Sequence, residues 1–206
     1  MKTFILVRHG TTEWLDKKIL HGISDVPLDE DGLRQAREAA QALKSVPASH
    51  LYSSPLLRCM QTAQAIGDQV HLQPVSMDNL IEMDFGWLEG KPFKDRESAS
   101  PLARFFDRHF RDLIRIISGE HQSSVRRRVL AAWEIILAEN KDEITIIVAH
   151  SGVLNQLLIH LFGKNFPKGE RYYRIRPCAI SEFTMSDDGQ AHLVRLDDVS
   201  HLSDYQ

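Results

Sequence analysis

The stretches that decide the fold are Ile5-Leu6-Val7-Arg8-His9-Gly10 and Ile146-Ile147-Val148-Ala149-His150-Ser151-Gly152. Each is a continuous apolar run that ends at a histidine followed by small residues. Apolar runs of this kind are typical of strands buried on both faces, as in a parallel sheet. Helical patterns lie between the two runs, which predicts an α/β fold. We expect a three-layer, doubly wound, mostly parallel sheet with helices on both faces and a small helical insertion.

Helix and turn signals divide the rest of the chain. Asp29 is a suitable N-cap for a helix whose apolar residues recur at helical spacing up to Leu43. Ser54 and Pro55 predict a second helix, with serine as its N-cap and proline as its first residue. The remaining predictions are helices over 102–117, 125–137 and 153–162, the last closed by Gly163, and a hairpin that joins 180–185 to 191–196. We treat residues 1–206 as one domain with a cap-like helical insertion at about 91–122.

The composition limits the classes of partner. The chain has 206 residues, with 25 Lys and Arg against 28 Asp and Glu, and a formal net charge of −3. This balance argues against a protein that coats nucleic acid, because such proteins usually carry a basic excess. It still leaves room for a small basic site inside a slightly acidic protein.

Cysteine usage and hydropathy indicate the environment of the protein. Cys59 and Cys178 are too few for a disulfide framework and lack the paired spacing of a zinc site. The apolar run at 4–7 is shorter than the core of about 7–15 residues that a signal peptide needs. No stretch approaches the roughly 18 apolar residues of a membrane span. We expect a soluble, cytoplasmic protein with no membrane or nucleic-acid partner. Its oligomeric state stays open, with a homodimer among the options.

The two strand-end histidines predict a ligand site. In open parallel sheets, ligands bind at the carboxyl ends of the strands, where His9 and His150 would face one another across a crevice. The alternative is that each is a hydrogen-bonded structural histidine, and for either one alone that interpretation is favoured. Their parallel placement shifts the balance, since a core has no need of an imidazole at both strand ends.

Two arginines indicate which ligand this site would bind. Arg8 adjoins His9, and Arg58 lies in the first turn of the helix opened by Ser54 and Pro55. A helix N-terminus attracts anions, and a guanidinium group matches phosphate oxygens bidentately. An isolated arginine would more simply be a surface ion-pair partner. The combination with the paired histidines predicts a phosphate site.

A possible proton donor lies in the segment 80–90, which is apolar apart from three acids and two glycines. A carboxyl group held among apolar groups has a raised pKa and can donate a proton near neutrality. The residue chemistry alone leaves Glu82, Asp84 and Glu89 as alternatives, and each of them is also consistent with a solvated loop carboxylate.

The same residues resemble a known family. Arg8-His9-Gly10-Thr11-Thr12-Glu13-Trp14 resembles the R-H-G-E/T signature of the histidine phosphatase superfamily, the phosphoglycerate mutase-like group. The resemblance continues in the family's order through residues 22–28, 32–36, 53–63, 82–90 and 148–152, so it spans most of the chain. In character the chain is most similar to the small phosphatases that have broad specificity or act on α-ribazole phosphate.

The resemblance implies a role for each candidate. His9 would be the nucleophile that forms a phosphohistidine, and Glu82 would protonate the leaving oxygen and then activate water. Arg8, Arg58 and His150 would hold the phosphoryl oxygens. Further phosphate or substrate contacts are expected from Ser151, Thr11, Thr12, His21 and Gly22. No metal and no other cofactor is expected, because the cationic cluster supplies the electrostatic stabilisation.

The chain departs from the family pattern at two places. The family commonly has asparagine where this chain has Leu15, and leucine has no hydrogen-bond donor in its side chain. The lost phosphate contact would be absent or taken over by Thr11, Thr12 or His21. An arginine that often precedes the next block is also missing from this chain, which has Ile19 and Leu20 in that region.

The reaction type has one favoured and two alternative interpretations. The insertion of about 30 residues and the short polar tail are smaller than in the cofactor-dependent mutases, and a more open site favours water as the final acceptor. We therefore predict a phosphomonoesterase that acts on a small phosphorylated metabolite. The alternatives are a cofactor-dependent phosphoglycerate mutase and a non-catalytic, phosphate-binding regulatory domain.

Several aromatic and basic residues receive a structural interpretation. The phenylalanines of the predicted insertion, Phe105, Phe106 and Phe110, are assigned to a core rather than to substrate contact. The basic stripe of Arg104, Arg108, Arg111 and Arg115 is assigned to a solvated face. The triplet 126–128 is assigned to surface charge, with one of its arginines able to reach inward.

Overall fold

The computed structural model describes residues 1–92, 119–141, 143–164 and 172–205, and in it six strands form one sheet. The strands lie in the order β3-β2-β4-β1-β5-β6. Their bounds are β1 Lys2–Arg8, β2 Ala48–Ser53, β3 Val75–Ser76, β4 Ile144–Ala149, β5 Ile180–Met185 and β6 Ala191–Asp198. The pairs β1–β4, β2–β4 and β2–β3 are parallel, whereas β5 is antiparallel to both β1 and β6. The sheet is therefore mostly parallel, as predicted.

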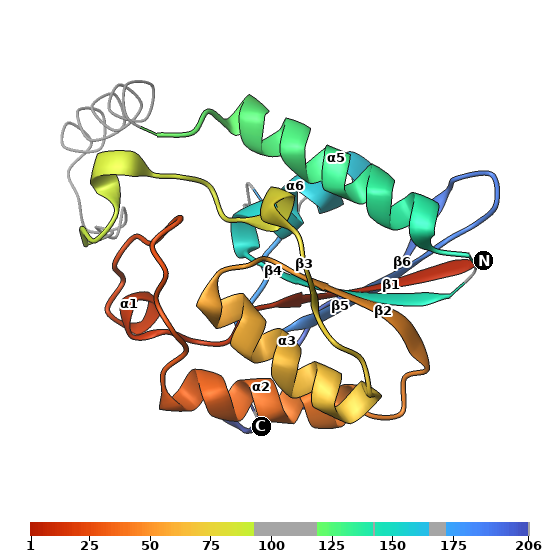
Figure 1. Ribbon diagram of the computed structural model, residues 1–206, viewed down its shortest axis with the longest axis horizontal. Coiled ribbons are helices and arrows are strands. Elements are labelled where there is room, and N and C mark those ends of the chain that lie inside the picture. The colour runs from red at the N-terminus through yellow and green to blue at the C-terminus, as the bar shows by residue number, and fades with distance from the viewer. Residues whose placement is uncertain (93–118, 142, 165–171, 206) are drawn as a thin grey trace.

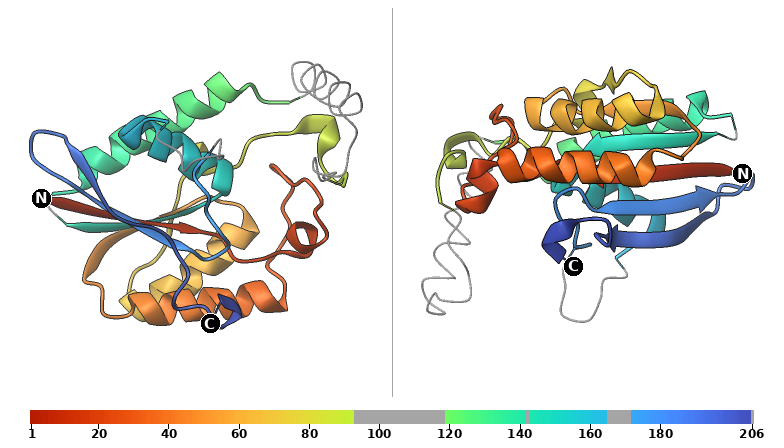
Figure 2. Two further views of the ribbon diagram at one scale, coloured as in Figure 1. Left: turned by 180° about the vertical axis from the view of Figure 1, so that it is seen from behind. Right: turned by 90° about the horizontal axis from the view of Figure 1, so that it is seen from below.

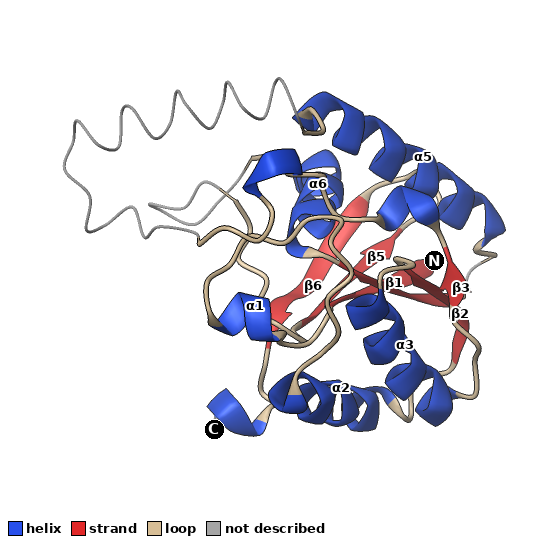
Figure 3. Ribbon diagram, turned by 60° about the vertical axis from the view of Figure 1, so that its left-hand side comes forward, coloured by secondary structure: helices blue, strands red, loops and turns tan. Residues whose placement is uncertain are grey.

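Helices cover both faces of this sheet (Figure 1). One face carries α2 (Glu30–Leu43) and α3 (Leu57–Val70), and the other carries α5 (Gln122–Glu139) and α6 (Ser151–Phe162). The short helix α1 (Glu13–Asp16) lies beyond the carboxyl ends of β1 and β4. Three single turns of 3₁₀-helix complete the described elements: η1 Asp78–Leu80, η2 Gly86–Leu88 and η3 Ser203–Tyr205. Figures 2 and 3 show the same layers from other directions and confirm the predicted three-layer α/β architecture.

The central strand β1 explains why both faces are covered. Its side chains alternate between the faces, and the four apolar ones from Phe4 to Val7 are all buried. Phe4 packs edge-on against Trp133 of α5, with 4.6 Å between the ring centroids. Ile5 and Val7 belong to a second core cluster that contains Ile66 of α3. The continuous apolar run in the sequence is thus the consequence of two cores that share one strand.

Most helix boundaries follow the sequence signals. Asp29 caps α2 as predicted, since its carboxylate accepts a hydrogen bond from the backbone N–H of Gly32 at 2.7 Å. Gly163 ends α6 with a positive φ of 71°. The predicted hairpin is formed by β5 and β6.

The predicted start of α3 is wrong. The helix begins at Leu57 rather than at Pro55, and the side chain of Ser54 does not cap it. The Ser54 hydroxyl lies instead 2.8 Å from the imidazole of His150, and the carboxylate of Asp25 accepts the N–H of Leu57 at 2.6 Å. A tertiary contact has therefore replaced the local cap. Arg58 still lies in the first turn of the helix, as predicted.

Two glycines bring the chain after β1 against the first turn of α2. A Cβ at Gly32 would overlap the carbonyl oxygen of Thr11, and a Cβ at Gly10 would lie 2.6 Å from the carbonyl oxygen of Gly32. In both cases the added Cβ would lie well inside the van der Waals contact distance of the oxygen atom. This close approach fixes the backbone directly after His9.

Some predictions concern residues that the structure does not describe. The helix expected over 102–117, and with it most of the cap-like insertion at about 91–122, lies outside the described residues. The assignment of residues 1–206 to one domain stays a prediction. In the described part of the chain, no helix combines the length and the apolar character that a membrane span requires.

Candidate active site

The parallel pairing of β1 with β4 brings His9 and His150 to the same edge of the sheet. The backbone N–H of His9 donates to the carbonyl of Ala149 at 3.0 Å, which continues the strand register past the end of β1. The two imidazole centroids are 5.1 Å apart, and both rings are buried. The histidines that follow the two apolar runs are therefore neighbours in space.

His9 has the protonation state of a nucleophile. Its Nδ1 lies 2.8 Å from the carbonyl oxygen of Gly10. A carbonyl oxygen only accepts, so Nδ1 carries the proton and Nε2 keeps a lone pair. Burial, followed by the charges of Arg8 and Arg58, holds the pKa of His9 well below its usual value. The ring is thus neutral near pH 7.

A cavity of about 620 Å³ opens at this edge, within the size range of small-molecule sites. We call the part lined by Arg8, His9, Arg58 and Glu82 the phosphoryl end. We call the part lined by Leu15, Ile19, Leu20, Met83 and Phe85 the outer wall. The cavity therefore joins a charged end to an apolar one.

Arg58 is fully buried and held from three sides. Its Nη1 donates to the carbonyl of Ser24 at 2.8 Å, and its Nη2 donates to the carbonyl of Gly22 at 2.7 Å. Its Nε lies 3.3 Å from Nδ1 of His150. Three of the five N–H donors of the guanidinium group are thus used, and two are left for an anion in the cavity.

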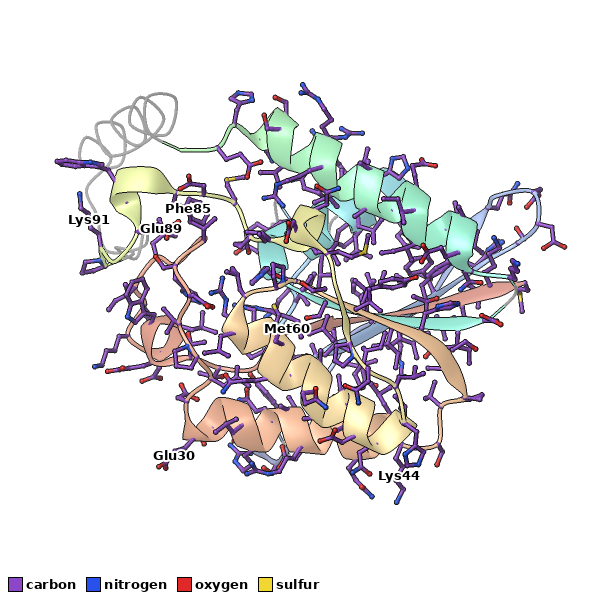
Figure 4. All side chains as sticks on the ribbon, in the orientation of Figure 1. Glu30, Lys44, Met60, Phe85, Glu89 and Lys91 are labelled. Atoms are coloured by element: carbon purple, nitrogen blue, oxygen red, sulfur yellow. The ribbon has the colours of Figure 1, made fainter. Side chains whose placement is uncertain are left out.

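Glu89 orders the loop that holds Arg58. Its carboxylate accepts the backbone N–H groups of Ile23 and Ser24, both at 2.9 Å, and that of Phe85 at 3.1 Å. It also accepts the hydroxyl of Ser24. Figure 4 shows Glu89 and Phe85 next to one another. Burial disfavours the ionised form, but these hydrogen bonds outweigh it and hold the pKa of Glu89 below its usual value. Glu89 is therefore an ionised structural carboxylate.

Glu82 is the carboxyl group that lines the phosphoryl end. Its side chain accepts the backbone N–H of Met83 at 2.9 Å and that of Gly152 at 3.1 Å. Burial raises the pKa of Glu82, and these hydrogen bonds together with Arg58 and Arg8 oppose the rise only in part. Asp84 instead accepts the backbone N–H of Gly86 at 2.6 Å. The geometry thus separates the three carboxyl groups that the sequence left as alternatives.

Arg8 lines the phosphoryl end and has one buried donor without a partner in the described part of the chain. Its Nη1 donates to the carbonyl of Ile175 at 2.8 Å. Its Nε is buried and has no hydrogen-bond partner among the described residues. Leaving a buried donor unpaired costs about 1–3 kcal/mol, and more for a charged group. The positive charge of Arg8 favours an anion beside His9.

His150 lies behind these groups and does not line the cavity among the residues described. Its Nδ1 accepts from Nε of Arg58, so Nε2 carries the proton and donates to the hydroxyl of Ser54. Burial, followed by the charge of Arg58, holds the pKa of His150 well below its usual value. The contact with phosphoryl oxygens that the resemblance implies stays a prediction.

The comparisons with known proteins agree with this geometry. The profile of the histidine phosphatase superfamily (branch 1) matches residues 4–198. The chain belongs to the histidine phosphatase superfamily. It is 34% identical over 184 residues to a probable phosphoglycerate mutase GpmB from Yersinia enterocolitica, which covers 88% of this chain and 84% of that protein. Some of the proteins that it resembles are named as phosphatases, and others are named as probable phosphoglycerate mutases.

Solved structures of the superfamily share the fold. YhfR from Bacillus stearothermophilus superposes with a TM-score of 0.81 at 26% identity, over 98% of this chain and 99% of that one. The α-ribazole phosphatase from Shigella flexneri superposes with a TM-score of 0.78 at 23% identity, over 95% of this chain and 96% of that one. At 23% identity, the similarity to the α-ribazole phosphatase establishes the fold alone.

The other predicted contact residues fall into two groups. Ser151 and His21 line the cavity, and the ring centroids of His21 and His9 are 6.0 Å apart. Burial, followed by the charge of Arg58, lowers the pKa of His21 to about 4, so this ring is neutral as well. In the described part of the wall, Thr11, Thr12 and Gly22 do not line the cavity.

Thr11, Thr12 and Gly22 instead form hydrogen bonds that support neighbouring parts of the site. The hydroxyl of Thr11 donates to Gln35 at 2.9 Å, and the hydroxyl of Thr12 caps α1 by accepting the N–H of Leu15 at 3.1 Å. The carbonyl of Gly22 accepts from Arg58. Their substrate contacts, which the resemblance implies, stay predictions.

The sequence named Glu89 as an alternative proton donor and the triplet 126–128 as surface charge, but it did not assign the supporting roles that Glu89 and Arg128 have. Arg128 is the member of the basic triplet that reaches inward, and its guanidinium group binds the backbone that carries Glu82. A signal was present in the sequence, because Arg128 is three residues after Val125 and four before Ala132, both on the buried face of α5. For Glu89 no comparable signal existed.

Proposed function

We propose that this member of the superfamily is a phosphomonoesterase that hydrolyses a small phosphorylated metabolite through a phosphohistidine at His9. One observation carries the proposal. Arg8, Arg58 and His9 line the same cavity, Arg58 has two guanidinium N–H groups without a partner among the described residues, and Nε2 of His9 keeps a lone pair. A phosphoryl group placed there would accept hydrogen bonds from the guanidinium groups and meet the nucleophile.

The reaction proceeds in two displacements at phosphorus. In the first, the Nε2 lone pair of His9 bonds to phosphorus, the bond to the leaving oxygen breaks, and that oxygen takes the proton of Glu82. In the second, Glu82 takes a proton from water as the water oxygen bonds to phosphorus and the bond to Nε2 breaks. The products are an alcohol and inorganic phosphate, and both side chains return to their starting states.

The charged groups present support each step. Arg8 and Arg58 would face the equatorial oxygens and stabilise the charge that they carry in the transition state. The raised pKa of Glu82 keeps a proton available for the leaving oxygen. The lowered pKa of His9 keeps the nucleophile unprotonated. The two shifts have opposite signs, as a neutral acid beside a neutral base requires.

The outer wall favours hydrolysis over phosphoryl return. A mutase that is primed by a bisphosphate must bind a second phosphate or a carboxylate away from the nucleophile. In the described part of the cavity, Lys18 is the only cation besides Arg8 and Arg58. The apolar side chains of the outer wall fit the carbon skeleton of an alcohol instead.

A phosphoglycerate mutase is the second candidate. The similarity to proteins named as probable phosphoglycerate mutases, at 34% identity, favours it. Conversion of 3-phosphoglycerate to 2-phosphoglycerate that depends on a bisphosphate primer would establish this activity. Release of inorganic phosphate from the same substrate would establish hydrolysis.

The test of the proposal combines a substrate panel with trapping of the intermediate. The wild-type protein, His9→Ala and the control His192→Ala, whose exposed ring lies on β6, are assayed for phosphate release from phosphorylated metabolites. We expect turnover and an acid-labile, base-stable phosphoenzyme in the wild type and the control, and neither in His9→Ala. Unchanged hydrolysis by His9→Ala would exclude the phosphohistidine. No hydrolysis across the panel would favour the regulatory phosphate-binding domain.

A further inference from the structure

Arg128 of α5 uses every donor that it has. Its Nη1 donates to the carbonyls of Asn79, at 3.0 Å, and Ile81, and its Nη2 donates to the carbonyl of Glu82 at 3.1 Å. Its Nε and Nη2 bind the carboxylate of Glu120 at 2.9 and 2.8 Å. All five N–H groups of the guanidinium are therefore engaged, and the side chain is 19% exposed.

The three carbonyls belong to a segment that has little regular structure of its own. The 3₁₀ turn η1 ends at Leu80, and the residues from Ile81 to Phe85 form neither helix nor strand. Carbonyls of such a segment need partners from elsewhere when they are buried. One planar guanidinium group supplies the partners for three of them and so fixes the backbone from which Glu82 projects.

The contact acts on geometry rather than on charge. The groups that face the carboxyl of Glu82 are the backbone N–H groups of Met83 and Gly152 and the charges of Arg58 and Arg8. Arg128 contacts the main-chain oxygen of Glu82, and its charge is balanced by Glu120. Within the described ranges the carboxyl itself has only two hydrogen bonds, so its position depends on the backbone behind it.

We infer that Arg128 is a positioning residue for proton transfer, because it holds the backbone of Glu82 at the distance that the leaving oxygen requires. This inference rests on the proposed function. Displacements of about 1 Å at a reacting group can cost on the order of 100-fold in rate. Arg126 and Arg127, the other members of the triplet, are exposed and have no such contact with the residues that the structure describes.

The dependence on leaving group separates this role from a general structural one. An alkyl phosphate needs a proton on its leaving oxygen, whereas 4-nitrophenolate leaves without one. The value of kcat/KM reports only the steps up to release of the alcohol, in which Glu82 acts as the acid. We expect Arg128→Met to lower kcat/KM for an alkyl phosphate such as glycerol 2-phosphate by about 10- to 100-fold. For 4-nitrophenyl phosphate we expect a decrease in kcat/KM of less than about threefold, since the acid contributes little there.

Two further variants complete the test. Arg127→Met, one residue away on the same helix, should leave both rates unchanged. Arg128→Lys should restore part of the alkyl phosphate rate, because an ammonium group can donate to some of the same carbonyls. An equal decrease in kcat/KM for both esters in Arg128→Met would assign a structural role and overturn the inference. A loss in Arg127→Met as large as that in Arg128→Met would overturn it as well.

A second measurement does not depend on turnover. The ¹³C resonance of the Glu82 carboxyl is followed with pH in the wild type, Arg128→Met and Arg127→Met. We expect the pKa of Glu82 to move towards its ordinary value in Arg128→Met alone. An unchanged titration in that variant would overturn the inference. Wild-type protein that hydrolyses neither ester would refute the proposed function, while this titration would still decide what Arg128 does.

Discussion

The phosphoryl end and the outer wall of the cavity are built in different ways. At the phosphoryl end, regular elements present the side chains, and other residues hold them: Arg58 lies in the first turn of α3, and His9 directly follows β1. The outer wall comes from α1, the loop after it and the segment that follows Glu82, and its side chains are apolar. Regular elements thus place Arg8, His9 and Arg58, whereas Glu82 lies on an irregular segment that Arg128 holds. Under the proposed function, the groups that select the leaving alcohol come largely from loops.

From this difference we infer that the phosphoryl end carries the chemistry common to the superfamily and that the outer wall carries the substrate specificity of this member. Movement of a guanidinium group or an imidazole at the phosphoryl end would break hydrogen bonds that several segments share. Replacement of a side chain on the outer wall changes apolar contact area and little else. We therefore expect large, substrate-independent effects from the first region and small, substrate-dependent effects from the second.

The largest expected effect is that of Glu82→Gln on alkyl phosphates, with a loss of about 10²- to 10⁴-fold in kcat. In the wild type, burial raises the pKa of Glu82, so its proton is retained to a higher pH and activity falls as pH rises through that raised pKa. Activity should also fall in acid, where His9 gains a proton below its lowered pKa. The variant should lose the alkaline limb of the pH–rate profile.

Asp84→Asn is the control for that prediction. Asp84 lies on the same segment, and its carboxylate accepts the backbone N–H of Gly86. This variant should keep both limbs of the profile. An alkaline limb that persists in Glu82→Gln would show that another group donates the proton.

Arg8→Met should have the next largest effect, a decrease of about 10²- to 10³-fold in kcat/KM for every phosphate ester tested. The variant removes the buried Nε donor at the phosphoryl end. Arg37→Met, at an exposed position of α2, is the control. Steady-state kinetics with several esters test this prediction, and a loss confined to one ester would place Arg8 in leaving-group selection instead.

Glu89→Gln should have an intermediate effect, a decrease of about tenfold in kcat/KM. A carboxamide has one acceptor oxygen instead of two, so the loop that binds Arg58 loses part of its support. Glu134→Gln, at an exposed position of α5, should have no effect. Full activity in Glu89→Gln would mean that Arg58 keeps its position without the ordered loop.

For Glu89→Gln we also predict how the free energy of unfolding changes with pH. Because the folded-state pKa of Glu89 lies below its unfolded value, its contribution to stability is complete above the unfolded pKa. It is lost as pH falls through the folded pKa. The difference in free energy of unfolding between wild type and Glu89→Gln should therefore be constant near neutrality and shrink in acid. Urea denaturation at several pH values would measure this difference.

Phe85→Ala should have the smallest effect, an increase of about tenfold in KM for phenyl phosphate with kcat nearly unchanged. The ring belongs to the outer wall, so KM for methyl phosphate should hardly change. Trp87→Ala is the control, because Trp87 is 74% exposed and does not line the described part of the cavity. An equal effect on both esters would mean that Phe85 supports the phosphoryl end.

The sequence alone was sufficient to predict a mostly parallel sheet, four of its six strands and most of the residues that line the phosphoryl end. Strand-end histidines and a helix-start arginine depend on local signals, whereas the strands β2 and β3 and the strand order were not predicted. The start of α3 could not be predicted, because Ser54 is drawn to His150, which lies 96 residues later. A distant contact overrode a local preference.

For a related reason, the sequence could not show which of the three acidic residues lines the phosphoryl end. Glu82, Asp84 and Glu89 lie within eight residues of one another and differ in what surrounds them rather than in type. Glu82 and Glu89 accept from backbone donors of other segments, whereas Asp84 accepts from Gly86 of its own. The outer wall could not be predicted for the same reason, because Leu15 of α1 and Phe85 are far apart in the sequence and line one cavity only in the folded protein.

The close approach of Gly10 and Gly32 has a consequence for mutational screens. Neither residue has a side chain that could react, yet any larger residue at either position must displace the backbone next to His9. We expect a screen that scores loss of activity to rank these two glycines with His9, the proposed nucleophile. A screen that scores abundance should separate them, since a change at His9 removes a reacting group and a change at either glycine displaces the backbone.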